Sequence, residues 1–186
     1  KRQPVDGLSI SSFVSTNSSD IATSGSTYAL GYYDSSDNSW TNYTTSTVGD
    51  AGNLTLGKGY QMASASGATM AFSGAVATSA QIQSVINNYN NGSGGGRFNL
   101  VANPFPSYIN LNDNNDASNN FLTVNSSVID GEFLAVYGYD ADGTGYSIYN
   151  HAANSPGDYI SPGQAFFVAA ESLSLIHISE PTRPPE

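Results

Sequence analysis

Two aspartate-bearing stretches contain residue types that could bind a metal ion. "YDADGTG" (139–145) begins with the Asp-x-Asp-Gly pattern of a calcium loop, but it lacks the later ligands and the bidentate glutamate. "YDSSDNS" (33–39) offers two more aspartates. Because Asp and Gly are also favoured in hairpin turns, a turn is the simpler interpretation of both stretches. The candidate ligands are Asp34, Asp37, Asp140 and Asp142, with Asp113 and Asp116 as further candidates, and calcium is the one cofactor that the sequence suggests.

Residues suited to catalysis are sparse. Cysteine is absent, and His151 is the one histidine outside the segment 173–186, in a turn-like setting without a nucleophile motif. Asp130 and Glu132 have the spacing of two carboxylates on one face of a strand, as glycoside hydrolysis could use. A turn at the start of a strand explains this pair equally well. We therefore expect a protein that is not an enzyme.

Aromatic side chains are the better candidates for ligand contact. Trp40 and Tyr43 stand three residues apart, and so do Tyr146 and Tyr149. Residues i and i+3 of a strand point to opposite faces, so at most one member of each pair can lie in the core. The other can be exposed and can stack on a sugar or on a partner protein, although cross-strand packing is the alternative.

These residues lie in segments that alternate apolar and polar side chains, with turn residues between them, as strands do. The one plausible helix, 79–91, lacks charged helix formers, and we expect it to be extended. The sequence predicts an all-β, β-sandwich-like fold. Its expected strands lie within residues 26–34, 53–64, 69–76, 98–105, 132–140, 146–150 and 163–170.

A constant offset of 106 residues relates the two halves of the chain. The match runs without a gap over about 34 positions and places aromatics on aromatics, which indicates an internal duplication. The matched pairs are Ala29 and Ala135, Leu30 and Val136, Tyr33 and Tyr139, Asp34 and Asp140, Trp40 and Tyr146, Tyr43 and Tyr149, Leu54 and Ile160, Gly57 and Gly163, and Tyr60 and Phe166.

The duplication divides the chain into units. The first covers about 1–89, a Gly-rich connector covers 90–97, and the second covers 97–172. "RFNLVANPFPSYINL" (97–111) is a strand followed by a proline corner, whereas the corresponding "QPVDGLSI" (3–10) lacks the strand, so we expect the first unit to be truncated at its start. "LSLIHISEPTR" (173–183) resembles a translated sequencing adapter, and we expect 173–186 to be a non-native, loosely packed tail. The alternative is a native final strand, because "SLSLIHI" alternates.

The charge excludes some partners. The formal net charge is −10, with five Lys and Arg against 15 Asp and Glu. A nucleic-acid partner is not expected, because the chain has no basic footprint to displace counterions. Membrane insertion is not expected either, because no apolar run approaches the ~18 residues of a membrane span.

Three stretches, "FNLVANPFPSYINL", "VYGYDADGTGY" and "YISPGQAFFVAA", resemble a β-rich module of large secreted Bacteroidota proteins, which are type IX secretion substrates. In that family the module usually stands upstream of a C-terminal sorting domain. The resemblance covers roughly 4–171, and Ala165 replaces a glycine that is usual there. It implies an extracellular or cell-surface location and carries no catalytic residues.

Three functions agree with these observations. The first is a non-catalytic surface module for adhesion or for contact with a polysaccharide or protein. The second is a structural subunit of an extracellular filament, which self-associates through sheet edges by β-strand addition. The third is an accessory domain of a polysaccharide-degrading enzyme.

Overall fold

The structure is a computed structural model that describes residues 5–89, 95–140, 143–152 and 157–179. Antiparallel strands make up most of its regular structure, which confirms the all-β prediction. The strands are β1 (Thr23–Ser24), β2 (Thr27–Asp34), β3 (Ser39–Thr44), β4 (Gln61–Met62), β5 (Gln81–Val85), β6 (Phe98–Ala102), β7 (Ile109–Asn110), β8 (Val136–Tyr139), β9 (Tyr146–Tyr149), β10 (Tyr159–Ile160), β11 (Ala165–Ala169) and β12 (Ser174–Ile178). The α-helices of the described residues are α1 (Ile10–Thr16) and α2 (Phe121–Val124), and short 3-10 turns lie at Val48–Asp50, Ala65–Gly67, Asn114–Asp116 and Gly131–Phe133.

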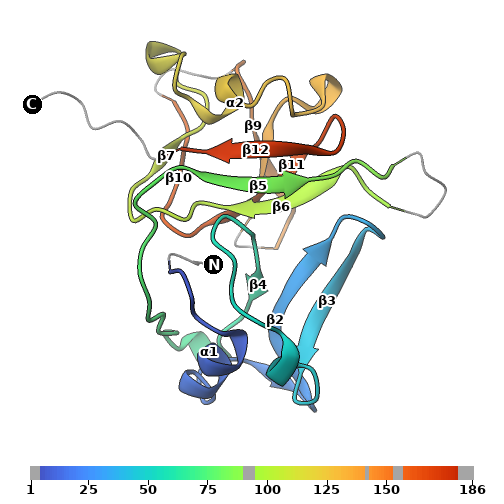
Figure 1. Ribbon diagram of the computed structural model, residues 1–186, viewed down its shortest axis with the longest axis vertical. Coiled ribbons are helices and arrows are strands. Elements are labelled where there is room, and N and C mark those ends of the chain that lie inside the picture. The colour runs from blue at the N-terminus through green and yellow to red at the C-terminus, as the bar shows by residue number, and fades with distance from the viewer. Residues whose placement is uncertain (1–4, 90–94, 141–142, 153–156, 180–186) are drawn as a thin grey trace, which may run out of the picture.

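The lower half in Figure 1 is built on one small sheet. Its strands are ordered β1-β2-β3, and β4 also pairs with β2. α1 packs beside this sheet and buries Ile10, Phe13 and Val14, whose spacing places them on one face of the helix. The Ser9 hydroxyl accepts a hydrogen bond from the Ser12 N–H (3.1 Å) and caps α1. The sequence prediction did not include this helix, because its seven residues contain no charged helix former.

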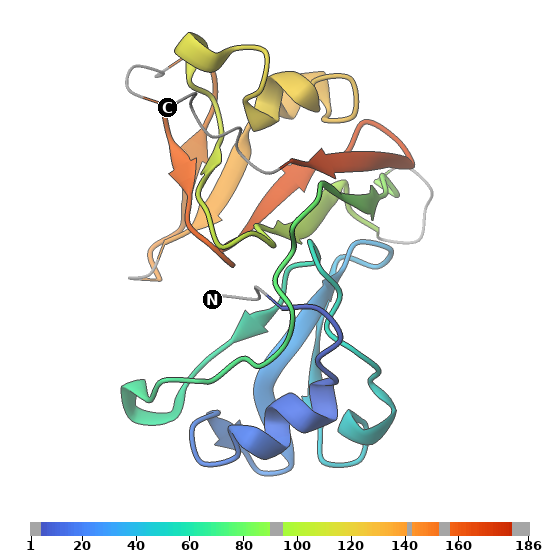
Figure 2. The ribbon, with the colours of Figure 1, turned by 60° about the vertical axis from the view of Figure 1, so that its left-hand side comes forward.

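The upper half contains three sheets around a second core. One is four-stranded, in the order β6-β11-β8-β9, and the others are the pairs β10-β7 and β12-β5. Phe105, Leu111, Leu122, Phe166 and Val168 are among the side chains that are almost completely buried between these sheets and α2. Figure 2 shows the two halves joined by the segment that leads into β5.

The two predicted hairpins have the same register at the predicted offset. Tyr33 of β2 pairs with Trp40 of β3, and Tyr139 of β8 pairs with Tyr146 of β9. The next strand also agrees, because the pair Gly31–Gln61 corresponds to the pair Tyr137–Phe167. These registers are what a duplication predicts, and they support it.

A buried asparagine occupies a similar place in each half. The Asn17 amide donates to the carbonyl of Ala71 (2.9 Å) and accepts from its N–H (2.6 Å). The Asn125 amide bonds the same two groups of His177, at 2.9 and 2.7 Å. Residues 71 and 177 differ by the predicted 106. The segment that ends the described chain therefore holds the place in the upper half that residues 70–72 hold in the lower half.

The C-terminal segment differs from its sequence prediction. Residues 174–178 form β12, which pairs with β5, and Ile176 and Ile178 are completely buried. The expectation of a loosely packed tail is wrong for these residues, because the alternation that any "SLIHI" strand has is enough to fill an apolar slot. The adapter origin of this segment stays a prediction, and residues 180–186 lie outside the described chain.

The unit boundary also needs a correction. β5 was assigned to the first unit, but Ala77 and Val85 pack in the upper core. The connector 90–97 therefore does not separate the two cores. As predicted, residues 81–85 are extended and not helical. The predicted truncation before Gln3 concerns residues outside the described chain.

Candidate functional site

The outer face of the four-stranded sheet carries a row of aromatic and aliphatic side chains. Phe167 of β11 pairs with Tyr137 of β8, which in turn pairs with Ile148 of β9. Directly paired antiparallel residues point to the same face, and residues i and i+2 of one strand share a face. We call this surface the aromatic face; it comprises Trp40, Phe98, Tyr137, Tyr139, Tyr146, Ile148 and Phe167.

Trp40 and Tyr146 meet on this face, although they come from different halves of the chain. Their rings lie 6.0 and 5.9 Å from the ring of Phe167, both in edge-to-face geometry. Tyr33 joins them at 5.0 Å from Phe167, and Tyr139 lies 5.5 Å from Tyr146. Each contact is in the range in which aromatic pairs attract. The cluster therefore holds its rings in fixed orientations.

Several of these side chains remain open to solvent. Trp40 is 42% exposed, Tyr146 49%, Tyr139 62% and Ile148 60%, whereas Phe167 beneath them is 8% exposed. Exposed aromatic rings that pack against one another on a sheet form a surface that a partly apolar ligand can contact.

Burial divides the predicted aromatic pairs as expected. Tyr43 lies in the lower core and is 9% exposed, and burial raises the pKa of its hydroxyl to about 12. Tyr149 is partly buried against the upper core. Trp40 and Tyr146 are the exposed members. The prediction of opposite faces is confirmed, and it removes Tyr43 from the candidate ligand contacts because a buried ring cannot stack on a ligand.

The hydroxyl of Tyr33 belongs to the hairpin beneath this face. It donates a hydrogen bond to the side-chain oxygen of Asn38. Burial, followed by the neighbouring Tyr146, Asp37 and Asp34, raises the pKa of Tyr33 above 10.0. Tyr33 therefore stays protonated at neutral pH and serves the turn as a donor.

The candidate calcium ligands of the two hairpins that lie in the described residues accept hydrogen bonds within the hairpins. Asp34 Oδ1 accepts from the N–H and the hydroxyl of Ser36, at 2.9 and 2.6 Å. Asp37 Oδ1 accepts in the same way from Ser39, and Asp140 Oδ1 accepts from the Ser147 hydroxyl (2.7 Å). Asp142 lies outside the described residues. Among the described residues no group of three or more Asp, Glu or His side chains is arranged for a metal ion.

The remaining polar candidates also have local structural contacts. Asp130 forms an ion pair with Arg97 (2.6 Å) and accepts from the Glu132 N–H (3.0 Å), which caps a 3-10 turn. Asp113 caps another 3-10 turn by accepting from the Asn115 N–H (2.9 Å). Asp116 accepts from the Asn119 amide (2.7 Å). These contacts explain the positions of the three aspartates without a catalytic or metal-binding role.

Phe167 is the site residue that the sequence analysis did not identify. In "GQAFFVAA" alternation places Phe166 and Phe167 on opposite faces, and Phe166 is the core residue. That signal marks Phe167 as outward-facing, but the strand order of the sheet brings Tyr146 to it, and only the docking of the two halves brings Trp40. No protein-family model, curated protein or solved structure matches this chain. In the described part of the chain no helix has the length and apolar character to cross a membrane.

Proposed function

We propose that this chain is a non-catalytic extracellular module that binds polysaccharide through the aromatic face. The observation that carries the proposal is the convergence of Trp40 and Tyr146, from equivalent hairpin positions, on the single ring of Phe167. The extracellular location rests on the resemblance to secreted Bacteroidota modules described above.

The chemistry of the face suits a neutral sugar polymer. The apolar C–H faces of a sugar ring pack on an aromatic ring, and this contact gains from removing both surfaces from water. The Tyr139 and Tyr146 hydroxyls can serve sugar hydroxyls at the rim, because a tyrosine hydroxyl both donates and accepts. Several exposed rings along one face of a sheet can contact successive sugars of a chain, whereas a single small molecule would contact only one or two of them.

A polysaccharide pull-down tests the proposal. The purified chain is incubated with insoluble cellulose, chitin and xylan, and the bound fraction is measured. We expect binding to at least one polymer and an affinity at least tenfold lower for the double variant Trp40→Ala/Tyr146→Ala. Tyr108→Ala is the matched control, since Tyr108 is 58% exposed and lies outside the aromatic face. Equal binding by the double variant and the wild type would overturn the proposal.

The edge of the same sheet favours a second candidate, a filament subunit. β9 ends the strand order β6-β11-β8-β9 and exposes Ile148, so it can accept a strand from another molecule. Light scattering over a range of concentrations tests this candidate. Fibres that form in the wild type and not in Ile148→Lys would favour it, and a monomer at all concentrations would exclude it.

A further inference from the structure

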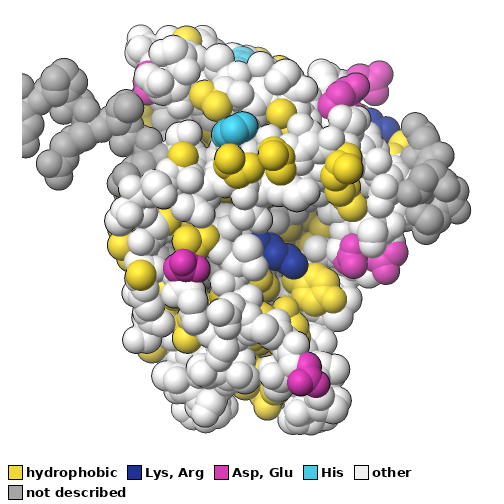
Figure 3. Space-filling model, in the orientation of Figure 1, with side chains coloured by type: hydrophobic (Ala, Val, Ile, Leu, Met, Phe, Trp, Pro, Cys, Tyr) yellow, Lys and Arg dark blue, Asp and Glu magenta, His cyan; other side chains and the backbone are white. Residues whose placement is uncertain are grey.

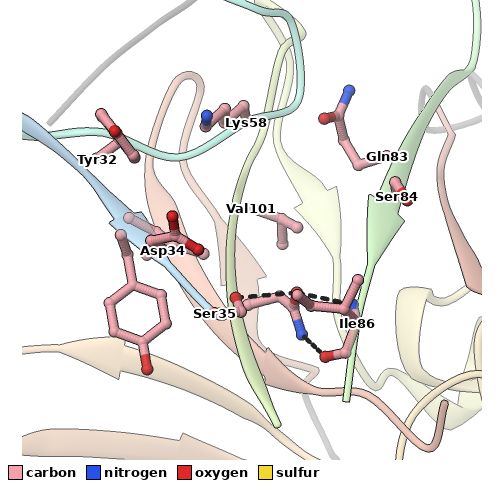
Figure 4. A pocket seen from close by; sticks show the side chains of 11 residues that line it. Tyr32, Asp34, Ser35, Lys58, Gln83, Ser84, Ile86 and Val101 are labelled. Atoms are coloured by element: carbon pink, nitrogen blue, oxygen red, sulfur yellow. Dashed lines mark hydrogen bonds between the residues drawn. The ribbon is translucent and has the colours of Figure 1, made fainter. Parts of the chain in front are cut away.

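A cavity lies between the two halves of the molecule, and Tyr33, whose ring contacts Trp40 and Phe167 of the aromatic face, is one of its lining residues. It has a volume of ≈ 280 Å³ and is lined by β2, by the loop that carries Lys58, and by β5 and β6. Figure 4 shows Lys58 and Tyr32 on one side, Gln83 and Ser84 on the other, and Val101 between them. In Figure 3 a single dark-blue side chain stands in the middle of the drawn face, beside a hollow. We call this cavity the Lys58 cleft.

Backbone pairing between the halves fixes the position of Lys58. Its loop forms an antiparallel bridge to Val101, with hydrogen bonds from the Gly59 N–H to the Leu100 carbonyl (3.0 Å) and from the Ala102 N–H to the Gly57 carbonyl (2.8 Å). Gly57 has φ +77°, and Gly59 lies so close to Leu100 that a Cβ there would meet it at 2.4 Å. The loop is therefore built tightly against β6, and Lys58 is held at the cleft wall.

Within the described residues, the Lys58 ammonium has no hydrogen bond or ion pair. It lies over the ring of Tyr32, 4.7 Å from the centroid, and 5.8 Å from that of Tyr60. Arg97, by contrast, is paired with Asp130. Burial lowers the pKa of Lys58 below 10.5, while the neighbouring Asp34 opposes this shift. An ammonium that is partly desolvated and lacks a hydrogen-bonding partner favours an anion that can reach it.

The other polar groups of the Lys58 cleft can form hydrogen bonds with the hydroxyls of a ligand. Asp34 uses Oδ1 for Ser36, and its Oδ2 has no hydrogen bond to the described residues. The hydrogen bonds of Ser36 lower the pKa of Asp34 below 3.8, so Asp34 is ionised and can accept from hydroxyl donors. The Gln83 amide nitrogen donates to the Leu56 carbonyl (2.5 Å), which leaves its oxygen as an acceptor. The Tyr32 hydroxyl forms no hydrogen bond to the described residues and adds a donor and an acceptor.

We propose that the Lys58 cleft binds a single hexuronate residue, with the sugar carboxylate on the Lys58 ammonium and the sugar hydroxyls on Asp34 and Gln83. The volume lies just below the range of pockets for drug-sized ligands, as a monosaccharide requires. A monoanion fits better than phosphate, because Asp34 repels a second negative charge. The net charge of −10 also opposes general attraction of anions, so binding depends on the local contacts.

Titrations followed by ¹H–¹⁵N NMR test this inference. The whole chain is titrated with D-glucuronate, D-galacturonate, D-glucose, acetate and inorganic phosphate. We expect at least one uronate to shift the amide signals around Lys58 and Gln83, with glucose, acetate and phosphate at least tenfold weaker. Acetate or phosphate equal to the uronate would overturn it, and so would the absence of uronate binding at tens of millimolar.

Variants separate this site from the aromatic face. Lys58→Gln should weaken uronate binding at least tenfold and leave polysaccharide pull-down unchanged, whereas Trp40→Ala/Tyr146→Ala should do the reverse. Ser127→Glu is the charge control, since it lowers the net charge by the same amount at an exposed position outside the cleft. Equal weakening by Ser127→Glu and Lys58→Gln would contradict the proposed contact. Uronate binding without any polysaccharide binding would refute the proposed function alone.

Discussion

At the residue scale, the difference between Trp40 and Tyr43 shows how one strand serves both a surface and a core. Trp40 is 42% exposed, and Tyr43 is buried at 9%. Tyr43 should therefore contribute more than Trp40 to stability, and Trp40 should contribute more than Tyr43 to ligand binding.

We expect Tyr43→Ala to lower the free energy of unfolding by about 3 kcal/mol, because removing a buried aromatic side chain leaves a cavity. Trp40→Ala should cost less, about 1 kcal/mol, since the ring is partly exposed, so its removal loses edge-to-face contacts but leaves no enclosed cavity. Urea denaturation of both variants measures the difference. Equal costs would contradict the assignment of Trp40 to the surface.

The lowered pKa of Asp34 gives a pH-dependent prediction. Because the folded-state pKa lies below 3.8, ionised Asp34 contributes stability above that pH, and this contribution is lost as pH falls through the folded-state pKa. The main cause is the hydrogen bond from the Ser36 hydroxyl, so Ser36→Ala should raise the pKa of Asp34 toward 3.8. An NMR titration of the Asp34 carboxyl carbon measures it; an unchanged pKa in the variant would exclude the hydroxyl as the cause.

Calcium binding can be tested at the hairpin aspartates Asp34, Asp37 and Asp140. Their turn hydrogen bonds lead us to expect no rise in melting temperature at millimolar calcium. A rise that Asp140→Ala abolishes would show that calcium binds the folded state and would overturn the turn interpretation.

At the element scale, β12 shows that alternation of apolar side chains is enough for a segment to dock as the strand beside β5. Ile176 and Ile178 point into the upper core, and Leu175, which precedes them on the opposite face of the strand, is 51% exposed. The Asn125 amide holds the backbone of His177, a contact that does not depend on the side chain it meets. The position beside β5 that β12 fills therefore requires alternating buried and exposed side chains, and not one particular sequence.

Ile176→Ala should lower the free energy of unfolding by about 2–5 kcal/mol, as buried isoleucines do. Leu175→Ala is the matched control, and we expect a cost of about 0.5 kcal/mol or less because its side chain is exposed. Chemical denaturation compares the two. If both variants unfold like the wild type, β12 is not docked in solution.

At the whole-molecule scale, the two halves share more than their hairpins. Asn17 and Asn125 hold residues 71 and 177 in the same way, and the registers around Gly31 and Tyr137 agree. If the chain is a duplication, equivalent contacts should have similar energies.

Asn17→Ala and Asn125→Ala should each cost about 2 kcal/mol or more, because each removes a buried amide that both donates to and accepts from the backbone of residue 71 or 177. The two values should agree within about 1 kcal/mol, and exposed Asn119→Ala should cost much less. Thermal or urea unfolding supplies the comparison. A large cost at only one of the two sites would mean that Asn17 and Asn125 do not have equivalent structural roles.

The sequence by itself determined the features that depend on local periodicity. Alternation placed Trp40 and Tyr43 on opposite faces, turn chemistry explained the aspartates of the hairpins, and the 106-residue offset aligned Tyr33 with Tyr139. These features follow from neighbours along the chain, because a strand's side-chain period is two wherever the strand lies.

The tertiary structure decided which distant segments meet. Only docking of the two halves brings Trp40 onto Phe167 and places Lys58 opposite Gln83, whereas the pairing of β11, β8 and β9 within the upper half brings Tyr146 there. It also moved β5 into the upper core and gave β12 a partner. Alternation fixes the face of a strand but not its neighbour, and many neighbours satisfy the same pattern; which one is chosen depends on the burial of the whole molecule.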